Sequence, residues 1–203
     1  MNIILASTSP YRRRLLERLQ IPFRCLPPLV DETPLPAEAP NTLAARLALA
    51  KARAVALLHP EALVIGSDQV AVLEDAPGPG GVAAAVTLGK PGSHEAARAQ
   101  LQACSGRVAR FYTGVAVCRI ASGFEAFHVE PFRVHFREVD DKSIENYLLR
   151  EQPYDCAGSF KCEGLGIALF ERMDGRDPTS LEGLPLIALT DLLAAAGCPV
   201  LGD

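Results

Sequence analysis

The sequence predicts a mixed fold of strands and helices, α/β or α+β, with a mixed rather than a purely parallel sheet. Segments typical of strands alternate with segments typical of amphipathic helices along the 203 residues. Two strand-like segments, 108–120 and 127–139, follow each other with no helix between them, which favours antiparallel neighbours. With 49% hydrophobic and 22% charged residues, the chain is ordinary globular material that can bury a core.

The N-terminal residues predict a strand followed directly by a helix. Residues 2–6 are apolar and typical of a buried strand, which a run of serine and threonine ends. Ser9 is a good N-cap, and Pro10 suits the first helical position because proline has no amide hydrogen to leave unpaired. We therefore expect a helix to begin at Pro10, with leucines along its buried side.

The next two elements are predicted to be a helix and a long strand. The proline-rich segment 27–40 is expected to be a loop, and Asn41 to cap a helix that runs to about Leu58. Residues 62–73 are typical of a strand, which we expect the polar residues 66–69 to interrupt.

The remaining elements are predicted from the same periodicities. A glycine- and proline-rich segment near 75–87 is expected to be a flexible surface loop. The other segments are three helices and one strand: helices 93–104, 140–150 and 185–196, and strand 164–173. Gly197 is expected to close the last helix.

Composition limits the classes of partner. The net charge is −4, and a protein that binds polymeric nucleic acid is more often basic, so this class is disfavoured while a small phosphorylated ligand stays open. Six cysteines form no C-x-x-C pair and no export signal is recognisable, so we expect free thiols and a cytoplasmic protein. No apolar run approaches the roughly 18 residues that a membrane helix needs.

Basic residues occupy an unfavourable position at the start of the first predicted helix, in the stretch LASTSPYRRRLL. A cation in the first turn opposes the helix dipole, and the first amide groups there have no partners within the helix. An anion bound by these amides, by Ser7 and by Arg12 and Arg13 would satisfy both requirements. The alternative is a solvated basic face with Glu17 nearby.

Two acidic residues and three lysines complete the candidate chemistry. Asp68 follows an apolar strand, where a buried carboxylate requires a partner, a metal or a catalytic role, although a turn or cap aspartate is an alternative. With Glu32 it offers oxygen ligands that suit Mg²⁺ or Mn²⁺. Lys51, Lys90 and Lys161 are further candidates, the last two beside glycines, and each is otherwise a surface lysine.

Seven short strings occur in the order in which they are found in the Maf family of nucleotide pyrophosphatases. They are LASTSPYRRRLL, VDETP, RLALAKA, GSDQVAV, GKP, YDCAGSFKCEG and GLPL, and the resemblance runs from Ile3 to about Leu193. The resemblance implies hydrolysis of a nucleoside triphosphate between its α and β phosphates. It also implies a single domain, 1–203, with a long curved mixed sheet and flanking helices that form a cleft, as in inosine-triphosphate pyrophosphatases.

The resemblance also implies roles for individual residues. It assigns the binding of the substrate phosphates to one serine and four basic residues: Ser7, Arg12, Arg13, Lys51 and Lys90. We add Lys161 as a further candidate for the same role. Asp68 would accept the proton of the attacking water, and Glu32 and Asp68 would hold a divalent cation, Mg²⁺ or Mn²⁺. A homodimer is expected by analogy with this kind of fold.

Three positions resemble the subgroup that acts on 7-methyl-GTP: Tyr11, Gln69 and Glu163. N7-methylation leaves the guanine base cationic, so that the face of Tyr11 could stack on it and the carboxylate of Glu163 could accept from N1–H and the amine. Two alternatives stay open: the same chemistry on other canonical or modified nucleotides such as dTTP or UTP, and a non-catalytic nucleotide-binding regulator of cell division.

Overall fold

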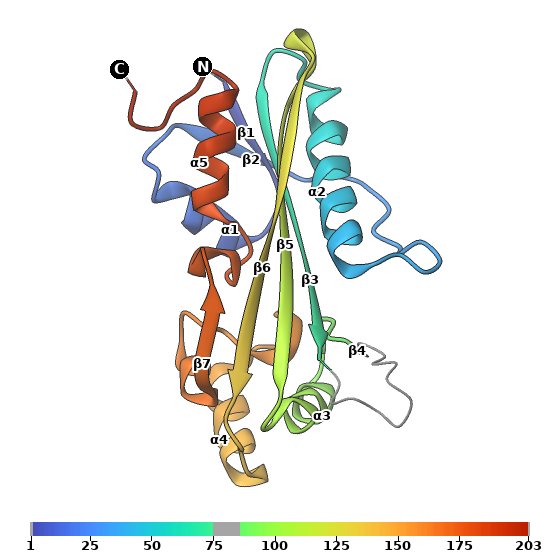
Figure 1. The fold of residues 1–203 in the computed structure, drawn as a ribbon, viewed down its shortest axis with the longest axis vertical. Coiled ribbons are helices and arrows are strands. Elements are labelled where there is room, and N and C mark those ends of the chain that lie inside the picture. Colours follow the sequence, from blue (N-terminus) through green and yellow to red (C-terminus); the bar gives the residue numbers. More distant parts are fainter. Residues whose placement is uncertain (1, 75–85, 203) are drawn as a thin grey trace. The chain divides into compact units, whose positions relative to one another are not determined.

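A computed structural model describes residues 2–74 and 86–202. Figure 1 shows the helices and strands in their order along the chain. The main elements are β1 (Ile3–Ala6), α1 (Pro10–Glu17), β2 (Phe23–Leu26), α2 (Pro40–Ala56), β3 (Leu63–Leu73), β4 (Val86–Thr87), α3 (His94–Cys104), β5 (Val108–Arg119), β6 (Phe124–Phe136), α4 (Asp141–Glu151), β7 (Phe170–Gly175) and α5 (Leu186–Ala195). Four short 3₁₀ helices, η1 to η4, lie at Ile120–Ser122, Ala157–Ser159, Leu165–Leu169 and Pro178–Ser180.

The sheet is mixed, as the sequence predicts. Within the described residues its strands are ordered β2-β1-β3-β5-β6-β7, and β4 pairs with β3 outside this path. β1 is parallel to both β2 and β3, whereas β3 with β4 and β6 with β7 are antiparallel. The predicted mixed α/β architecture is therefore confirmed.

The contacts divide the chain into two compact units. Unit 1 comprises residues 1–69, 112–130 and 177–203, and unit 2 comprises residues 70–111 and 131–176. β3, β5 and β6 contribute residues to both units. Each unit is described separately below.

Unit 1 buries both faces of its strands. Along β1, Ile3 and Leu5 pack with the leucines of α1 and α5, while Ile4 and Ala6 pack with the alanines of α2. Alternate residues of a strand point to opposite faces, so this division places α1 and α5 on one face and α2 on the other. Figure 1 shows the same arrangement.

Unit 2 has an aromatic core and two packed helices. The rings of Phe136, Phe160 and Phe170 meet edge to face with centroids 4.8 to 5.7 Å apart, and Phe111 adds a further contact to Phe160. α3 and α4 pack against each other. Their N-caps are Ser93 and Asp140, so the predicted starts of both helices are confirmed.

Some predicted elements are wrong. Asn41 does not cap α2, because Pro40 is already the first helical residue and Ala39 occupies the N-cap without a side-chain hydrogen bond. β3 is not interrupted at residues 66–69 and runs continuously through them. Residues 164–173 are not one strand, since Leu165–Leu169 form a 3₁₀ helix before β7 begins.

A physical cause accounts for the last of these differences and for one strand that was not predicted. Gly164 and Gly166 both donate their amide hydrogens to the Lys161 carbonyl oxygen, a turn that is incompatible with extended backbone. β2 has no strand prediction at all, because its four residues, three half-exposed and one exposed, carry no clear alternation. Residues 75–85 of the predicted loop lie outside the described residues, and Val86–Thr87 at its end form β4.

Candidate functional site

Lys51 lies between two carboxylates in unit 1. Its ammonium nitrogen Nζ donates to Oδ1 of Asp68 at 2.6 Å and is 2.8 Å from Oε1 of Glu32. The side chains of Lys51 and Asp68 are 6% and 10% exposed, whereas that of Glu32 is 57% exposed. The pair with Asp68 is therefore a buried ion pair, and the pair with Glu32 is largely solvated.

Small residues bring Lys51 to this position. A Cβ atom at Gly66 of β3 would overlap the carbonyl oxygen of Ala48, and one at Gly114 of β5 would overlap that of Ala44. Only glycine lets the backbone of α2 lie this close to the two strands. One turn further along α2, the ammonium of Lys51 then reaches Asp68 on β3.

Arg12 has its charge balanced by groups from three distant segments. Ser9 caps α1 as predicted, and its Oγ accepts the amide hydrogen of Arg12 at 3.4 Å. Nε of Arg12 donates to the Gly183 carbonyl oxygen at 2.8 Å. Burial lowers the pKa of the Arg12 guanidinium from its ordinary value, and the carboxylates of Asp68 and Glu32 act in the opposite direction.

Ser7 lies in the turn between β1 and α1. Its side chain is buried, and its Oγ accepts the amide hydrogen of Ser9 at 3.1 Å. The hydroxyl hydrogen of Ser7 is left to donate to another acceptor. The turn that leads into α1 thus carries two serine hydroxyls, and that of Ser9 contacts the backbone of Arg12.

A turn at residues 177–184, which we call the 177–184 turn, holds the Gly183 carbonyl in place. Ser67 Oγ lies 2.9 Å from the Gly183 carbonyl oxygen, and Thr113 Oγ1 donates to that of Ser180 at 2.9 Å. Asp177 caps the turn by accepting from the amide and hydroxyl of Thr179 at 2.9 and 2.6 Å. Sequence reasoning missed these residues, although a buried D-P-T-S segment is a recognisable turn signal.

Gln69 belongs to the same network. Its Nε2 lies 2.9 Å from the Ser180 carbonyl oxygen, 3.0 Å from Thr113 Oγ1 and 3.3 Å from the Leu181 carbonyl oxygen. The amide group of Gln69 therefore ties the end of β3 within unit 1 to the 177–184 turn, which carries the acceptor of Arg12.

The loop that carries Glu32 is fixed by hydrogen bonds on both sides. Asp31 Oδ1 accepts from the amide and the hydroxyl of Thr33 at 2.9 and 2.6 Å. Arg46 of α2 binds both carboxylate oxygens of Glu38, at 2.6 and 2.8 Å, and the Thr33 carbonyl oxygen at 3.1 Å. These bonds lower the pKa of Glu38 to about 2.

Arg13 and Tyr11 have other partners. Nε of Arg13 pairs with Glu17 Oε1 at 3.0 Å on the surface of α1, where both side chains are at least half exposed. The guanidinium of Arg14 lies over the ring of Tyr11, 5.1 Å from its centroid. Of the two predicted phosphate-binding arginines, the one with electrostatic interactions to Asp68 and Glu32 is Arg12.

The other predicted site residues belong to unit 2. Lys90 is exposed, just before α3. Lys161 Nζ donates to the Glu151 carbonyl oxygen at 2.9 Å, and its backbone amide donates to the Tyr147 hydroxyl at 3.1 Å. Glu163 is exposed, and its Oε2 accepts a contact from the thiol of Cys162 at 3.7 Å.

Two features are absent from the part of the chain that the structure describes. Residues 2–74 and 86–202 contain no group of three or more histidine, cysteine, aspartate or glutamate side chains that could hold a metal ion by themselves. Among these same residues, no helix has both the length and the apolar character that crossing a bilayer requires.

A family model and the most similar relatives that were compared all point to the same protein family. The family described as Maf-like protein matches residues 2–196. A protein named 7-methyl-GTP pyrophosphatase from Polaromonas sp. strain JS666 is 56% identical over 201 residues, covering 99% of this chain and 87% of its own. Proteins of the same name from Nitrosococcus oceani and Alkalilimnicola ehrlichii are 54% and 52% identical, covering 98% and 99% of this chain and 95% and 96% of their own.

A solved structure with a similar arrangement is the nucleoside-triphosphatase, or dITP/XTP pyrophosphatase, of Mycobacterium abscessus. It is 18% identical, covers 97% of each chain and has a TM-score of 0.47.

Proposed function

The chain belongs to the Maf-like protein family, and we propose that it hydrolyses the α–β phosphoanhydride of 7-methyl-GTP to 7-methyl-GMP and pyrophosphate. Relatives that are 52% to 56% identical over nearly the whole chain carry this name. The observation that carries the proposal is the buried pair of Lys51 and Asp68, 2.6 Å apart and near Arg12. A carboxylate and two cations gathered at a buried point are suited to phosphate chemistry.

In the proposed reaction, a water molecule attacks the α-phosphorus in line with the leaving pyrophosphate. Asp68 accepts the proton of that water as a general base. Arg12 and Lys51 stabilise the negative charge that develops on the leaving group. Ser7 contributes its free hydroxyl hydrogen to a phosphate oxygen. No covalent intermediate with the protein is needed.

The carboxylates fit a divalent cation. Glu32 and Asp68 both reach the ammonium nitrogen of Lys51, so their oxygens face one point, and a cation bound there would require that this ammonium move to the substrate phosphates. Oxygen is the donor that Mg²⁺ and Mn²⁺ prefer. Such ions are often bound by one or two carboxylates, with water and substrate phosphates as the other ligands. When bound, the cation would neutralise phosphate charge and lower the pKa of the reacting water.

Base selection is assigned to three residues, two of them in unit 1. Tyr11 would stack on the cationic methylated base through a cation–π interaction. Its ring already forms an interaction of this kind with the guanidinium of Arg14. Gln69 would act by fixing the 177–184 turn, since its Nε2 is bound to that turn. Glu163 of unit 2 would accept from the guanine edge.

Three further basic residues are part of the proposal through the family resemblance. Lys90 and Lys161 of unit 2 and Arg13 of unit 1 would contact the phosphates. For Lys161 this requires that the ammonium leave the Glu151 carbonyl oxygen, and for Arg13 that it leave Glu17.

The experiment that tests the proposal is pyrophosphate release from a panel of nucleotides with Mg²⁺ or Mn²⁺. We expect the highest kcat/KM for 7-methyl-GTP over GTP, UTP and dTTP. Asp68→Asn should abolish release while nucleotide binding remains, and Asp191→Asn, at an exposed position of α5, is the matched control.

Two results would contradict the proposal. Near-normal turnover by Asp68→Asn would remove Asp68 from the role of general base. Tight nucleotide binding by the wild-type protein without pyrophosphate release under any condition of the panel would favour a non-catalytic nucleotide-binding role.

A further inference from the structure

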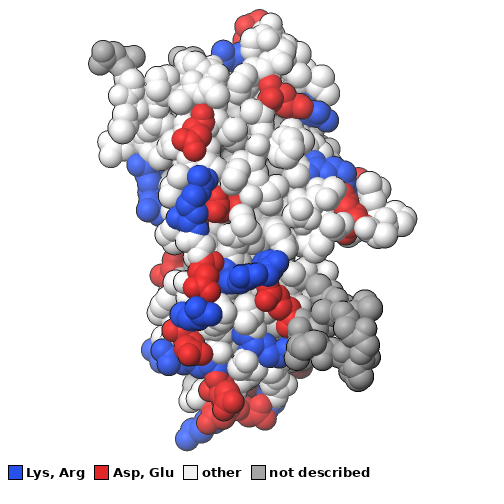
Figure 2. Space-filling model, in the orientation of Figure 1, with Lys and Arg blue, Asp and Glu red and all other residues white. Residues whose placement is uncertain are grey.

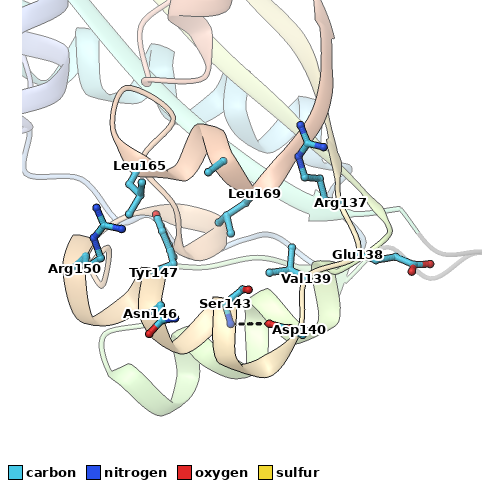
Figure 3. A pocket seen from close by; sticks show the side chains of 11 residues that line it. Arg137, Glu138, Val139, Asp140, Ser143, Asn146, Tyr147, Arg150, Leu165 and Leu169 are labelled. Atoms are coloured by element: carbon cyan, nitrogen blue, oxygen red, sulfur yellow. Dashed lines mark hydrogen bonds between the residues drawn. The ribbon is translucent and has the colours of Figure 1, made fainter.

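Unit 2 contains a cavity that none of the proposed phosphate- or base-binding residues lines. Its volume is about 440 Å³, and it lies between α4, the residues that follow β6, and the 3₁₀ helix Leu165–Leu169. This volume is within the range of small-molecule sites, roughly 300–1,000 Å³. Figure 3 shows the side chains around it.

One part of the cavity wall is apolar. Val139, Leu165, Ala168 and Leu169 contribute aliphatic side chains, and the ring of Tyr147 lies among them. Tyr147 is buried and is held in place because its hydroxyl oxygen accepts the amide hydrogen of Lys161. Its phenol hydrogen is therefore available to a ligand, and burial raises its pKa so that this hydrogen is retained at neutral pH.

Two arginines flank the cavity. Figure 3 shows Arg150 and Arg137 on opposite sides of it. Both are exposed, and among the described residues neither guanidinium has a hydrogen-bond or ion-pair partner within 4 Å. Most other arginines of unit 2 are paired with acidic groups, as Arg172 is with Asp174.

Two acidic residues also belong to the lining, but within the described residues neither forms an ion pair with these arginines. Glu138 points away from the cavity in Figure 3. Asp140 caps α4, where its Oδ1 accepts the amide hydrogen of Ser143 at 2.7 Å, and hydrogen bonds from the side chain and then the backbone of Ser143 lower the pKa of Asp140. On the face shown in Figure 2, acidic and basic side chains are interspersed, so that a small anion suits the molecule better than a polyanion.

We propose that this cavity binds a small organic anion, with a carboxylate or phosphate group attached to an apolar ring. The ring would lie against Leu165, Leu169 and Tyr147, and the anionic group would pair with Arg150 or Arg137. Asn146 supplies a side-chain amide to the same lining. This inference does not depend on the proposed pyrophosphatase activity.

The test uses 2-naphthoate as the probe, with 2-naphthamide as its neutral counterpart and acetate as a charged group without a ring. The chain has no tryptophan, so naphthoate fluorescence can be followed directly. We expect naphthoate to bind with a Kd on the order of 1 mM or tighter. Both controls should bind at least about tenfold more weakly, because each lacks one of the two interactions.

Variants of the whole chain locate the probe. Arg150→Gln and Arg137→Gln should each weaken binding of naphthoate about fivefold, and Arg172→Gln, which removes a paired surface arginine of unit 2, should not. Ala168→Phe, which adds a ring without adding a tryptophan, should prevent binding by filling the cavity, with an unchanged urea midpoint as evidence that it folds. Pyrophosphate release from 7-methyl-GTP should be unchanged in all four variants.

Three results would overturn the proposal. The first is equal affinity for naphthoate and naphthamide. The second is binding that pyrophosphate displaces and that Arg12→Gln removes, since the probe would then occupy the site of unit 1. The third is loss of self-association rather than of probe binding in the arginine variants, because the cavity would then receive a second copy of the chain.

Discussion

Replacement of Lys51 by methionine tests the buried ion pair directly. Methionine keeps an unbranched side chain of similar length but removes the ammonium. The pair with Glu32, whose side chain is 57% exposed, contributes at most about 1 kcal/mol. The pair with Asp68 is buried, and removing one partner of such a pair costs about 3–5 kcal/mol because the other charge is left without compensation. We expect Lys51→Met to lower the free energy of unfolding by about 3 kcal/mol at pH 7.

A double-mutant cycle separates this effect from a loss of packing. In Lys51→Met combined with Asp68→Asn neither member of the pair is left as an unpaired buried charge, so the double variant should be less destabilised than the sum of the two single variants by about 2 kcal/mol. Urea unfolding followed by circular dichroism measures each corner of the cycle. Glu32→Gln is the control, with an expected loss below about 1 kcal/mol.

The reasoning would be refuted by additive effects in this cycle. Additivity would mean that the ammonium of Lys51 and the carboxylate of Asp68 do not interact in the folded protein. A loss in Glu32→Gln as large as that in Lys51→Met would also contradict the assignment of the buried contact to Asp68.

Two further variants test the packing and the pH dependence. Gly114→Ala should lower the free energy of unfolding by about 3 kcal/mol, since its Cβ would overlap the backbone of Ala44, whereas Gly89→Ala, with open space around it, should change it by less than about 0.5 kcal/mol in the same urea titration. Because Arg46 lowers the pKa of Glu38 from 4.5 to about 2, the pair stabilises the fold above pH 4.5, and this stabilisation is lost as the pH falls toward 2. The urea midpoint of Glu38→Gln should therefore depend less steeply on pH in this window than that of the wild-type protein, and parallel curves would show that the pair contributes nothing.

The sequence predicts a structural feature correctly where that feature depends only on neighbouring residues. The cap of α1 at Ser9, with Pro10 next, is a matter of a few neighbouring residues, and so are the caps of α3 and α4 at Ser93 and Asp140. A buried carboxylate at Asp68 was also predictable, because the apolar residues before it require burial.

The predictions failed where polar groups are satisfied by distant partners. The polar residues in the middle of β3 were predicted to interrupt it, but Ser67 and Gln69 bond to carbonyl oxygens 116 and 111 residues away. No periodicity can show such partners, so a strand with satisfied polar groups has the same pattern as a broken one. The acceptor of Arg12 at Gly183 was missed for the same reason.

The charges of the site in unit 1 lead to a last prediction. Arg12 and Lys51 carry two positive charges, and Glu32 and Asp68 carry two negative charges, so the group is formally neutral and has no net attraction for a triphosphate. A divalent cation bound by the carboxylates would change this balance and make the group attractive to the triphosphate.

Without metal, Glu32→Gln removes one repulsive charge and should tighten binding of 7-methyl-GTP about threefold. With Mg²⁺ the same variant should bind the nucleotide more weakly than the wild-type protein, because it has lost an oxygen ligand. Calorimetric titrations in the two buffers measure both affinities, and an effect of the same sign in both would show that Glu32 does not contribute through a cation.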